Sequence, residues 1–138
     1  MQITNFQDLL TAAAQQTEAQ RLLLVFAGAA LPADASAQQR AEFEAGHGGE
    51  LAPLMCVDKL PQEIASFAAL SAEADRLARD WQIVFATSLS GSPGQPPSST
   101  QAEAALQKMV ESIKAGQLDA FIPFNRAGEP VRLQSAGA

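Results

Sequence analysis

The stretch Leu22-Leu23-Leu24-Val25-Phe26-Ala27-Gly28 (LLLVFAG, residues 22–28) decides the fold that the sequence predicts. Its apolar residues follow one another without the polar alternation of a half-exposed strand, which is typical of a strand covered on both faces. Gly28 ends this run. Two further runs of the same kind, LMCV at 54–57 and WQIVFA at 81–86, predict a second and a third buried strand.

Helical patterns alternate with these runs along the chain. They cover residues 6–17, 36–46, 61–80 and 100–116. Within the third segment, Ser66 or Ser71 could equally restart the helix, and the fourth begins at a capping box formed by Thr100 and Glu103. The alternation of helices and strands predicts an α/β fold, a single-domain three-layer sandwich with a mostly parallel sheet.

The C-terminal part has the pattern of a β-hairpin. Residues 121–124 and 129–133 read as two short strands across a glycine-containing turn. Pro123 and Pro130 put this hairpin at the edge of the sheet, because a proline cannot donate to a central ladder. We therefore expect one domain over residues 1–133 and a flexible tail over 134–138.

Composition narrows the class of partner. The 138 residues are 47% hydrophobic, and 9 Lys plus Arg against 15 Asp plus Glu leave a net charge of -6. No run of basic residues interrupts this acidic balance, so we expect no nucleic-acid partner. The chain begins without a basic leader and its apolar runs are too short to cross a bilayer, which predicts a cytoplasmic protein that binds no membrane.

The ends of the predicted strands indicate where a ligand would bind. In parallel sheets, ligands lie beyond the carboxyl ends of the strands. Three segments follow the carboxyl ends of the predicted strands: residues 28–34, the charged pair Asp58 and Lys59, and the loop 88–94. The candidate binding residues are Asp58, Lys59, Ser88, Ser90, Gly91 and Ser92.

The loop SLSGSPG at 88–94 has two interpretations. Its small residues would let a backbone approach a phosphate, yet it matches neither of the glycine-rich phosphate motifs nor the G-x-S-x-G nucleophile motif. The same composition is typical of a connector that only forms turns. Both interpretations remain open at the level of sequence.

Metal and thiol chemistry are not expected. Glu44 and His47 have the Glu-x-x-His spacing of carboxylate di-iron sites, but those sites use the motif twice. Cys56, the single cysteine, lies within an apolar run where a thiol is usually an inert core residue. We expect no metal site and no cofactor.

Four segments resemble one protein family. They are the strand at 22–28, PLMCVDK at 53–59, IVFATSLSG at 83–91 and IKAGQLDAFIPFNRAGEPV at 113–131. Together they are similar to a family of small bacterial proteins of uncharacterised function, some labelled "ribonucleotide reductase subunit alpha", over most of the chain. The large subunit of that reductase needs a redox pair of cysteines and a radical-bearing thiol in a far longer barrel. Cys56 is alone here, so the resemblance carries over no functional residue.

These observations predict a small binding domain rather than a ribonucleotide reductase. Its partner would be a protein or a small ligand at the carboxyl edge of the sheet. The first alternative is an enzyme that uses Asp58, Lys59 and the 88–94 loop on a phosphorylated or acylated substrate. The second is a self-associating module, a possible homodimer that pairs through a hairpin edge or an apolar helix face.

Overall fold

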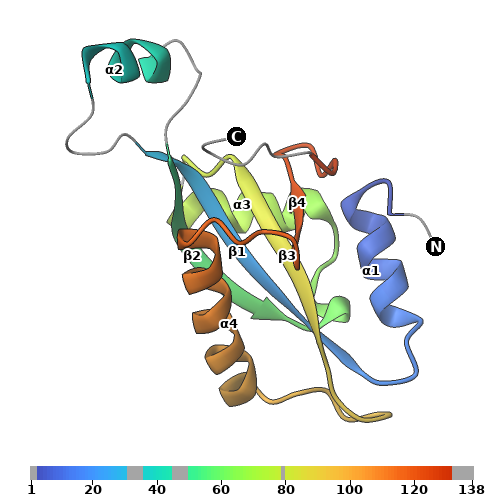
Figure 1. Cartoon of the computed structure of the whole chain (residues 1–138). Helices are drawn as coiled ribbons and strands as arrows, with labels where there is room; N and C mark the ends of the chain where they lie inside the picture. Colours follow the sequence, from blue (N-terminus) through green and yellow to red (C-terminus); the bar gives the residue numbers. More distant parts are fainter. Residues whose placement is uncertain (1–2, 31–35, 45–49, 79, 132–138) are drawn as a thin grey trace.

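A computed structural model of the chain describes residues 3–30, 36–44, 50–78 and 80–131. Four α-helices, one short 3₁₀ helix and four strands lie within these residues (Figure 1). In chain order they are α1 (Phe6–Ala14), β1 (Gln20–Ala30), α2 (Ala37–Glu44), β2 (Glu50–Lys59), η1 (Pro61–Glu63), α3 (Phe67–Leu77), β3 (Ile83–Ser90), α4 (Ser99–Lys114) and β4 (Ile122–Phe124).

The four strands form one antiparallel sheet in the order β2-β1-β3-β4. Every pair of neighbours is antiparallel. The predicted α/β class with a mostly parallel sheet is therefore wrong, and the protein has an α+β fold. The reason is the place of β1, which lies between β2 and β3 (Figure 1).

The connections explain how alternating helices and strands give this sheet. The chain from β1 to β2 carries α2, which lies beyond one end of the sheet and does not cross its face (Figure 1), so β2 returns antiparallel to β1. The chain from β2 to β3 carries η1 and α3 and does cross a face. β2 and β3 consequently run in the same direction, but β1 separates them, and no parallel pair forms among the described strands.

The apolar run of β1 is buried on both faces, as its sequence predicts. Successive side chains of a strand point to opposite faces, and Leu22, Leu24 and Phe26 belong to a core cluster different from that of Leu23 and Val25. All five are at most 3% exposed. In β1 the continuous apolar sequence therefore corresponds to burial on two faces, but it does not indicate the direction of the neighbouring strands.

One face of the sheet packs against α1, η1 and α3. Its core cluster includes Phe6 of α1, Leu70 of α3 and Trp81 just before β3. Edge-on aromatic pairs join the layers, with the ring centroid of Phe6 lying 5.2 Å from that of Phe124 and the centroid of Phe26 lying 5.0 Å from that of Trp81. Such pairs add to the stabilisation that comes from burying the rings.

Among the described elements, α4 is the helix that covers the opposite face, and Leu118 and Phe121 pack beside it. The helix turns Ala102, Leu106, Met109 and Ile113 toward Phe85 and the alternate residues of β1. Their spacing at i, i+4, i+7 and i+11 is the helical spacing read from the sequence, and the prediction of this helix is confirmed apart from its first turn. α4 has 16 residues, whereas a membrane-spanning helix needs about 20. No described helix is long and apolar enough to cross a membrane.

Side-chain caps define where α1 and α3 begin. Asn5 accepts a 2.8 Å hydrogen bond from the backbone N–H of Asp8. The hydroxyl and backbone N–H of Thr4 donate to the Asp8 carboxylate and lower its pKa below the ordinary value. Ser66 caps α3 by accepting from the backbone N–H of Ala69 at 3.0 Å. Of the two serines that could restart the third predicted helix, Ser66 is the one used.

Prolines mark both edge strands. β2 contains Pro53, beside a register shift between Phe26 and Ala27 of its partner strand. β4 contains Pro123, and its return segment, expected as a strand over 129–133, makes only the bridge between Phe124 and Pro130 in the described residues. The predicted tail at 134–138 lies outside the described residues.

Candidate functional site

The predicted candidate residues lie at one end of the sheet, on either side of the start of β1. Because β2 and β3 run in the same direction, their C-terminal ends meet at this end. Leu22 pairs with Lys59 on one side and with Ser88 on the other, and Gln20 pairs with Ser90. The segment 28–34 is not part of this gathering, because Gly28 lies toward the opposite end of β1 and residues 31–35 lie outside the described residues.

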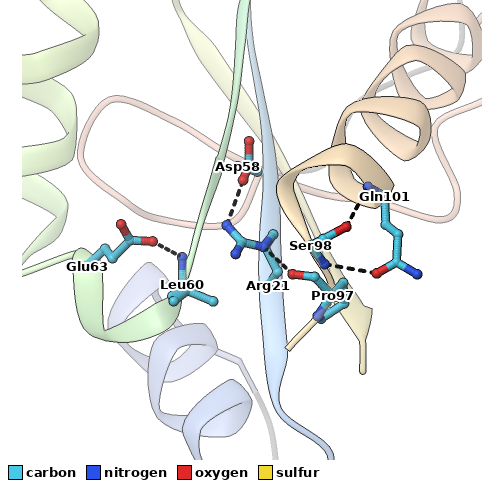
Figure 2. A network of polar contacts seen from close by, with 7 residues as sticks. All are labelled: Arg21, Asp58, Leu60, Glu63, Pro97, Ser98 and Gln101. Atoms are coloured by element: carbon cyan, nitrogen blue, oxygen red, sulfur yellow. Dashed lines mark hydrogen bonds and ion pairs between the residues drawn. The ribbon is translucent and has the colours of Figure 1, made fainter. Parts of the chain in front are cut away.

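Asp58 and Lys59 point to opposite faces, since they are consecutive strand residues. The Asp58 carboxylate lies 2.7 Å from Nη1 of Arg21 (Figure 2). Lys59 Nζ lies 3.0 Å from the carboxylate of Glu73 on α3. The structure therefore separates the two residues that the sequence suggested as a charged pair, and each makes an ion pair with a different element.

Ser88 and Ser90 surround the buried amide of Gln20, which is 7% exposed. Both hydroxyls donate to its Oε1. Its Nε2 donates to Ser90 Oγ at 2.9 Å and to the carbonyl of Glu18 at 3.0 Å. The serines thus have a structural task in the described structure, because they satisfy a polar group that would otherwise be costly to bury.

The glycine-containing loop folds back on itself. The N–H of Ser92 donates to the carbonyl of Gln95 at 2.9 Å, and the N–H of Gly91 donates to the carbonyl of Ala19 at 2.8 Å. Gly94 has a φ of 74°, which suits the third residue of a type II turn after Pro93. These two N–H groups are used within the chain and do not form a cradle for a phosphate.

Gly91 is required by close packing. A Cβ atom at this position would lie 2.2 Å from the carbonyl oxygen of Gln95. Ser90, Gly91 and Ser92 also line a hollow of about 450 Å³ with Pro97. The loop is therefore a tightly packed turn with a concave outer side.

Arg21 joins three segments at this end of the sheet (Figure 2). Besides the Asp58 contact, its Nε donates to the carbonyl of Pro97 at 2.7 Å. The next residue, Ser98, forms a reciprocal capping box with Gln101, with hydrogen bonds of 2.9 and 3.1 Å. The predicted box of Thr100 and Glu103 is wrong, because Thr100 already lies within α4.

A concavity lies beside this network, on the α1 side of the sheet. We call it the α1–η1 groove. It has a volume of about 780 Å³, within the range of ligand sites, and is bounded by α1, η1 and the turn around Gly94 and Pro96. Leu10, Ala13 and Ile64 form a buried apolar floor.

Glutamines dominate the walls of this groove. Gln7, Gln15, Gln16, Gln20 and Gln62 all line it. None of its lining residues is ionisable or aromatic. Sequence reasoning missed the groove, although one signal was present: the exposed positions of the first helix carry uncharged polar residues at a spacing of four, Gln7, Thr11 and Gln15, whereas exposed helix faces commonly carry charges.

The two chemical candidates that sequence analysis set aside lie elsewhere. Cys56 is exposed on edge strand β2, so its expected place in the core is wrong. It stands opposite Val25 on the α4 side, where the buried residues come from β1, β3 and α4. Glu44 ends α2, and His47 lies outside the described residues.

Comparison with known proteins adds no relative. No family model, no curated protein and no solved structure matches this chain.

Proposed function

We propose that this protein is a non-catalytic binding domain that holds its ligand in the α1–η1 groove. The observation that carries the proposal is the composition of the groove: an apolar floor and five glutamines within about 780 Å³. Concave sites with apolar walls and a few polar groups are the usual form of binding sites. The proposed ligand site lies at the same end of the sheet as the predicted candidate residues, on the face that Lys59, Ser88 and Ser90 share with the groove residue Gln20.

The contacts of the predicted residues support binding over catalysis. An enzyme acting on a phosphorylated substrate would need cations that face the phosphate. Arg21 and Lys59 each contact a carboxylate, and the Ser88 and Ser90 hydroxyls donate to Gln20. We also propose a bacterial cytoplasmic setting, on the resemblance and the composition described above.

Nuclear magnetic resonance can test the proposal through the side-chain amide signals of the groove glutamines. The probes are a nucleotide, a phosphorylated sugar, an acyl carrier, a neutral oligosaccharide and a neutral peptide. At least one is expected to shift the signals of Gln7 and Gln62. Ala14→Trp fills the groove and should abolish the shift, whereas Ala104→Trp, at another exposed helical alanine, should leave it intact.

Two results would contradict this function. One is a panel in which no probe moves the groove amides at millimolar concentration. The other is a probe that binds parent and Ala14→Trp proteins alike. A probe that shifts only the signals of residues 88–92 would instead restore the binding site predicted from sequence.

Self-association is a second candidate, favoured by β2. This strand has ten residues and lies at an edge of the sheet. Leu54 on it is 45% exposed, an unusual exposure for a leucine on an edge. Pro53 and the neighbouring register shift weaken its capacity to pair, since both interrupt a regular ladder. Light scattering that gives a monomer mass at every concentration up to the millimolar range would remove this candidate.

A further inference from the structure

We infer that the ligand of the α1–η1 groove is an uncharged, extended segment of another protein. The inference rests on the proposed function and names the chemical class of its ligand. Three properties of the groove carry it: the absence of charge and aromatic rings from its lining, the unengaged amides on its walls, and the spacing of polar residues along α1.

The lining matches an uncharged ligand. The chain carries a net charge of -6, yet no ionisable side chain lines the groove. A phosphate or carboxylate is recognised by Arg, Lys or a charged donor set, and a cationic ligand would gain nothing from neutral walls. A charged ligand would therefore lose its water here without gaining a counter-charge.

The absence of aromatic side chains from the lining of the groove also argues against ligands with flat rings. Proteins commonly bind nucleobases by stacking them on aromatic or guanidinium planes. The lining residues are aliphatic, amide, hydroxyl, proline and glycine in kind. A ligand with a flat ring therefore has no side chain on which to stack in the groove, whereas a polypeptide can bind without stacking.

The wall amides complement a peptide backbone. A carboxamide carries two donors and an acceptor, and a peptide group likewise carries one donor and one acceptor. Among the described contacts, the side chains of Gln7, Gln15 and Gln62 make no hydrogen bond, so their amides are available. Gln20 is different, because its amide is already fully engaged by Ser88, Ser90 and Glu18.

The spacing along α1 suits an extended chain. Gln7, Thr11 and Gln15 follow one another at four-residue intervals, which places them about 6 Å apart along the helix axis. Alternate residues of an extended chain are about 6.6 Å apart. A segment lying along α1 therefore meets one polar side chain at every second residue. Its intervening side chains point away from α1, so the apolar floor residue outside that helix, Ile64, is the one they can meet.

The experiment uses three blocked octapeptides and the full-length protein. The first alternates apolar residues with serine or glutamine and carries no charge. The second has glutamates in place of its polar residues, and the third keeps the neutral sequence but has N-methyl groups on alternate backbone amides. The neutral peptide is expected to shift the amide signals of Gln7 and Gln62, and the other two are expected to bind at least about tenfold more weakly.

A matched pair of variants locates the contact. Gln7→Glu replaces an amide by a carboxylate of the same shape in the first turn of α1, where a negative charge stabilises a helix, so weaker binding would not come from unfolding. We expect it to bind the neutral peptide at least about tenfold more weakly. Gln107→Glu, on the exposed side of α4, should bind like the parent.

Three outcomes would overturn the inference: no binding of the neutral peptide, equal binding of all three peptides, or equal binding to Gln7→Glu and the parent. If one of these occurs while another probe still binds the groove and is blocked by Ala14→Trp, the ligand class is wrong and the proposed function stands. If no probe of any class binds there, both are wrong.

Discussion

Arg21 and Arg126 perform the same structural task at opposite ends of the sheet, in different surroundings. Each joins an aspartate carboxylate to a backbone carbonyl of another segment. Arg21 contacts Asp58 and the carbonyl of Pro97, both at 2.7 Å. It thereby ties β1 to β2 and to the residue before the α4 cap.

Arg126 makes the equivalent contacts in the turn that follows β4. Its Nη2 lies 2.7 Å from the carboxylate of Asp75 on α3, and its Nη1 donates to the carbonyl of Trp81 at 2.6 Å. The guanidinium also lies over the indole ring, 4.5 Å from its centroid. Trp81 in turn donates from Nε1 to Asp75 at 3.0 Å.

The two arginine–aspartate pairs differ in their exposure to solvent. The side chains of Arg21 and Asp58 are 14% and 24% exposed, against 44% and 39% for Arg126 and Asp75. Water screens an exposed pair and lowers its net contribution, whereas breaking a pair that is largely removed from water leaves one charge without compensation. Equal distances therefore predict unequal contributions to stability.

The largest effect is expected for Arg21→Ala, with a loss of about 2–3 kcal/mol in the free energy of unfolding, because Asp58 and the Pro97 carbonyl both lose a charged donor. Urea denaturation would show it as a lower midpoint at an unchanged slope. Arg21→Lys should recover only part of the loss, since an ammonium lacks the planar fork that reaches both acceptors. A loss below about 0.5 kcal/mol, the size of an ordinary surface effect, would show that Arg21 is no different from a surface arginine.

Arg126→Ala should cost about 1–1.5 kcal/mol, from the screened ion pair, the hydrogen bond and the cation–π contact together. The same denaturation measurement applies, and a change in Trp81 fluorescence should accompany it. Arg40→Ala, on the exposed part of α2, is the control and should change stability by less than about 0.5 kcal/mol. If Arg126→Ala costs as much as Arg21→Ala, burial does not explain the comparison.

Ser98→Ala should cost about 1 kcal/mol, the usual effect of a lost helix cap. Thr100→Ala, at the cap expected from sequence, should leave the free energy of unfolding unchanged or raise it by a few tenths of a kcal/mol, because Thr100 is exposed within α4 and alanine has the higher helix propensity. Ser98 follows Pro97, whose carbonyl accepts a hydrogen bond from Arg21. Ser98→Ala and Arg21→Ala should therefore be non-additive by at least about 0.5 kcal/mol in a double-mutant cycle. Simple additivity would mean that Arg21 does not position the start of α4.

The smallest effect concerns salt. Raising the NaCl concentration from about 0.05 M to about 1 M should reduce the coupling energy of Arg126 with Asp75 by a few tenths of a kcal/mol, since salt screens exposed charges most. The coupling of Arg21 with Asp58 should change less. Double-mutant cycles at both concentrations measure each coupling, and an equal decrease would contradict the contrast.

The sequence predicts burial correctly for two of its three apolar runs, and it does not predict how the strands pair. The run 54–57, predicted as a buried strand, lies in edge strand β2, where Leu54 is 45% exposed and Cys56 is exposed. The run 22–28 and the stripe of α4 are determined by local periodicity, and both are confirmed. The direction of β1 relative to its neighbours depends on whether the connection through α2 crosses the sheet, and no local pattern encodes that choice. The parallel sheet was therefore predicted from an order of elements that also fits an antiparallel one.

The candidate site was predictable only in its approximate place. Asp58 and Ser88 do come to the same end of the sheet, but their partners are distant in sequence: Arg21 is 37 residues from Asp58, and Gln20 is 68 residues from Ser88. Ser98-x-x-Gln101 and Thr100-x-x-Glu103 overlap as capping patterns, and composition alone does not choose between them.

The central position of β1 affects the order in which the protein can be completed during synthesis. On one face, Leu23 and Val25 are covered by α4 residues such as Leu106. At roughly 5–20 residues per second, the ribosome needs about 4–16 s to add the roughly 80 residues between them. Throughout that interval, the face of β1 that α4 later covers is exposed in the nascent chain. The most apolar segment of the protein is therefore synthesised early and is fully buried only after α4 has been added.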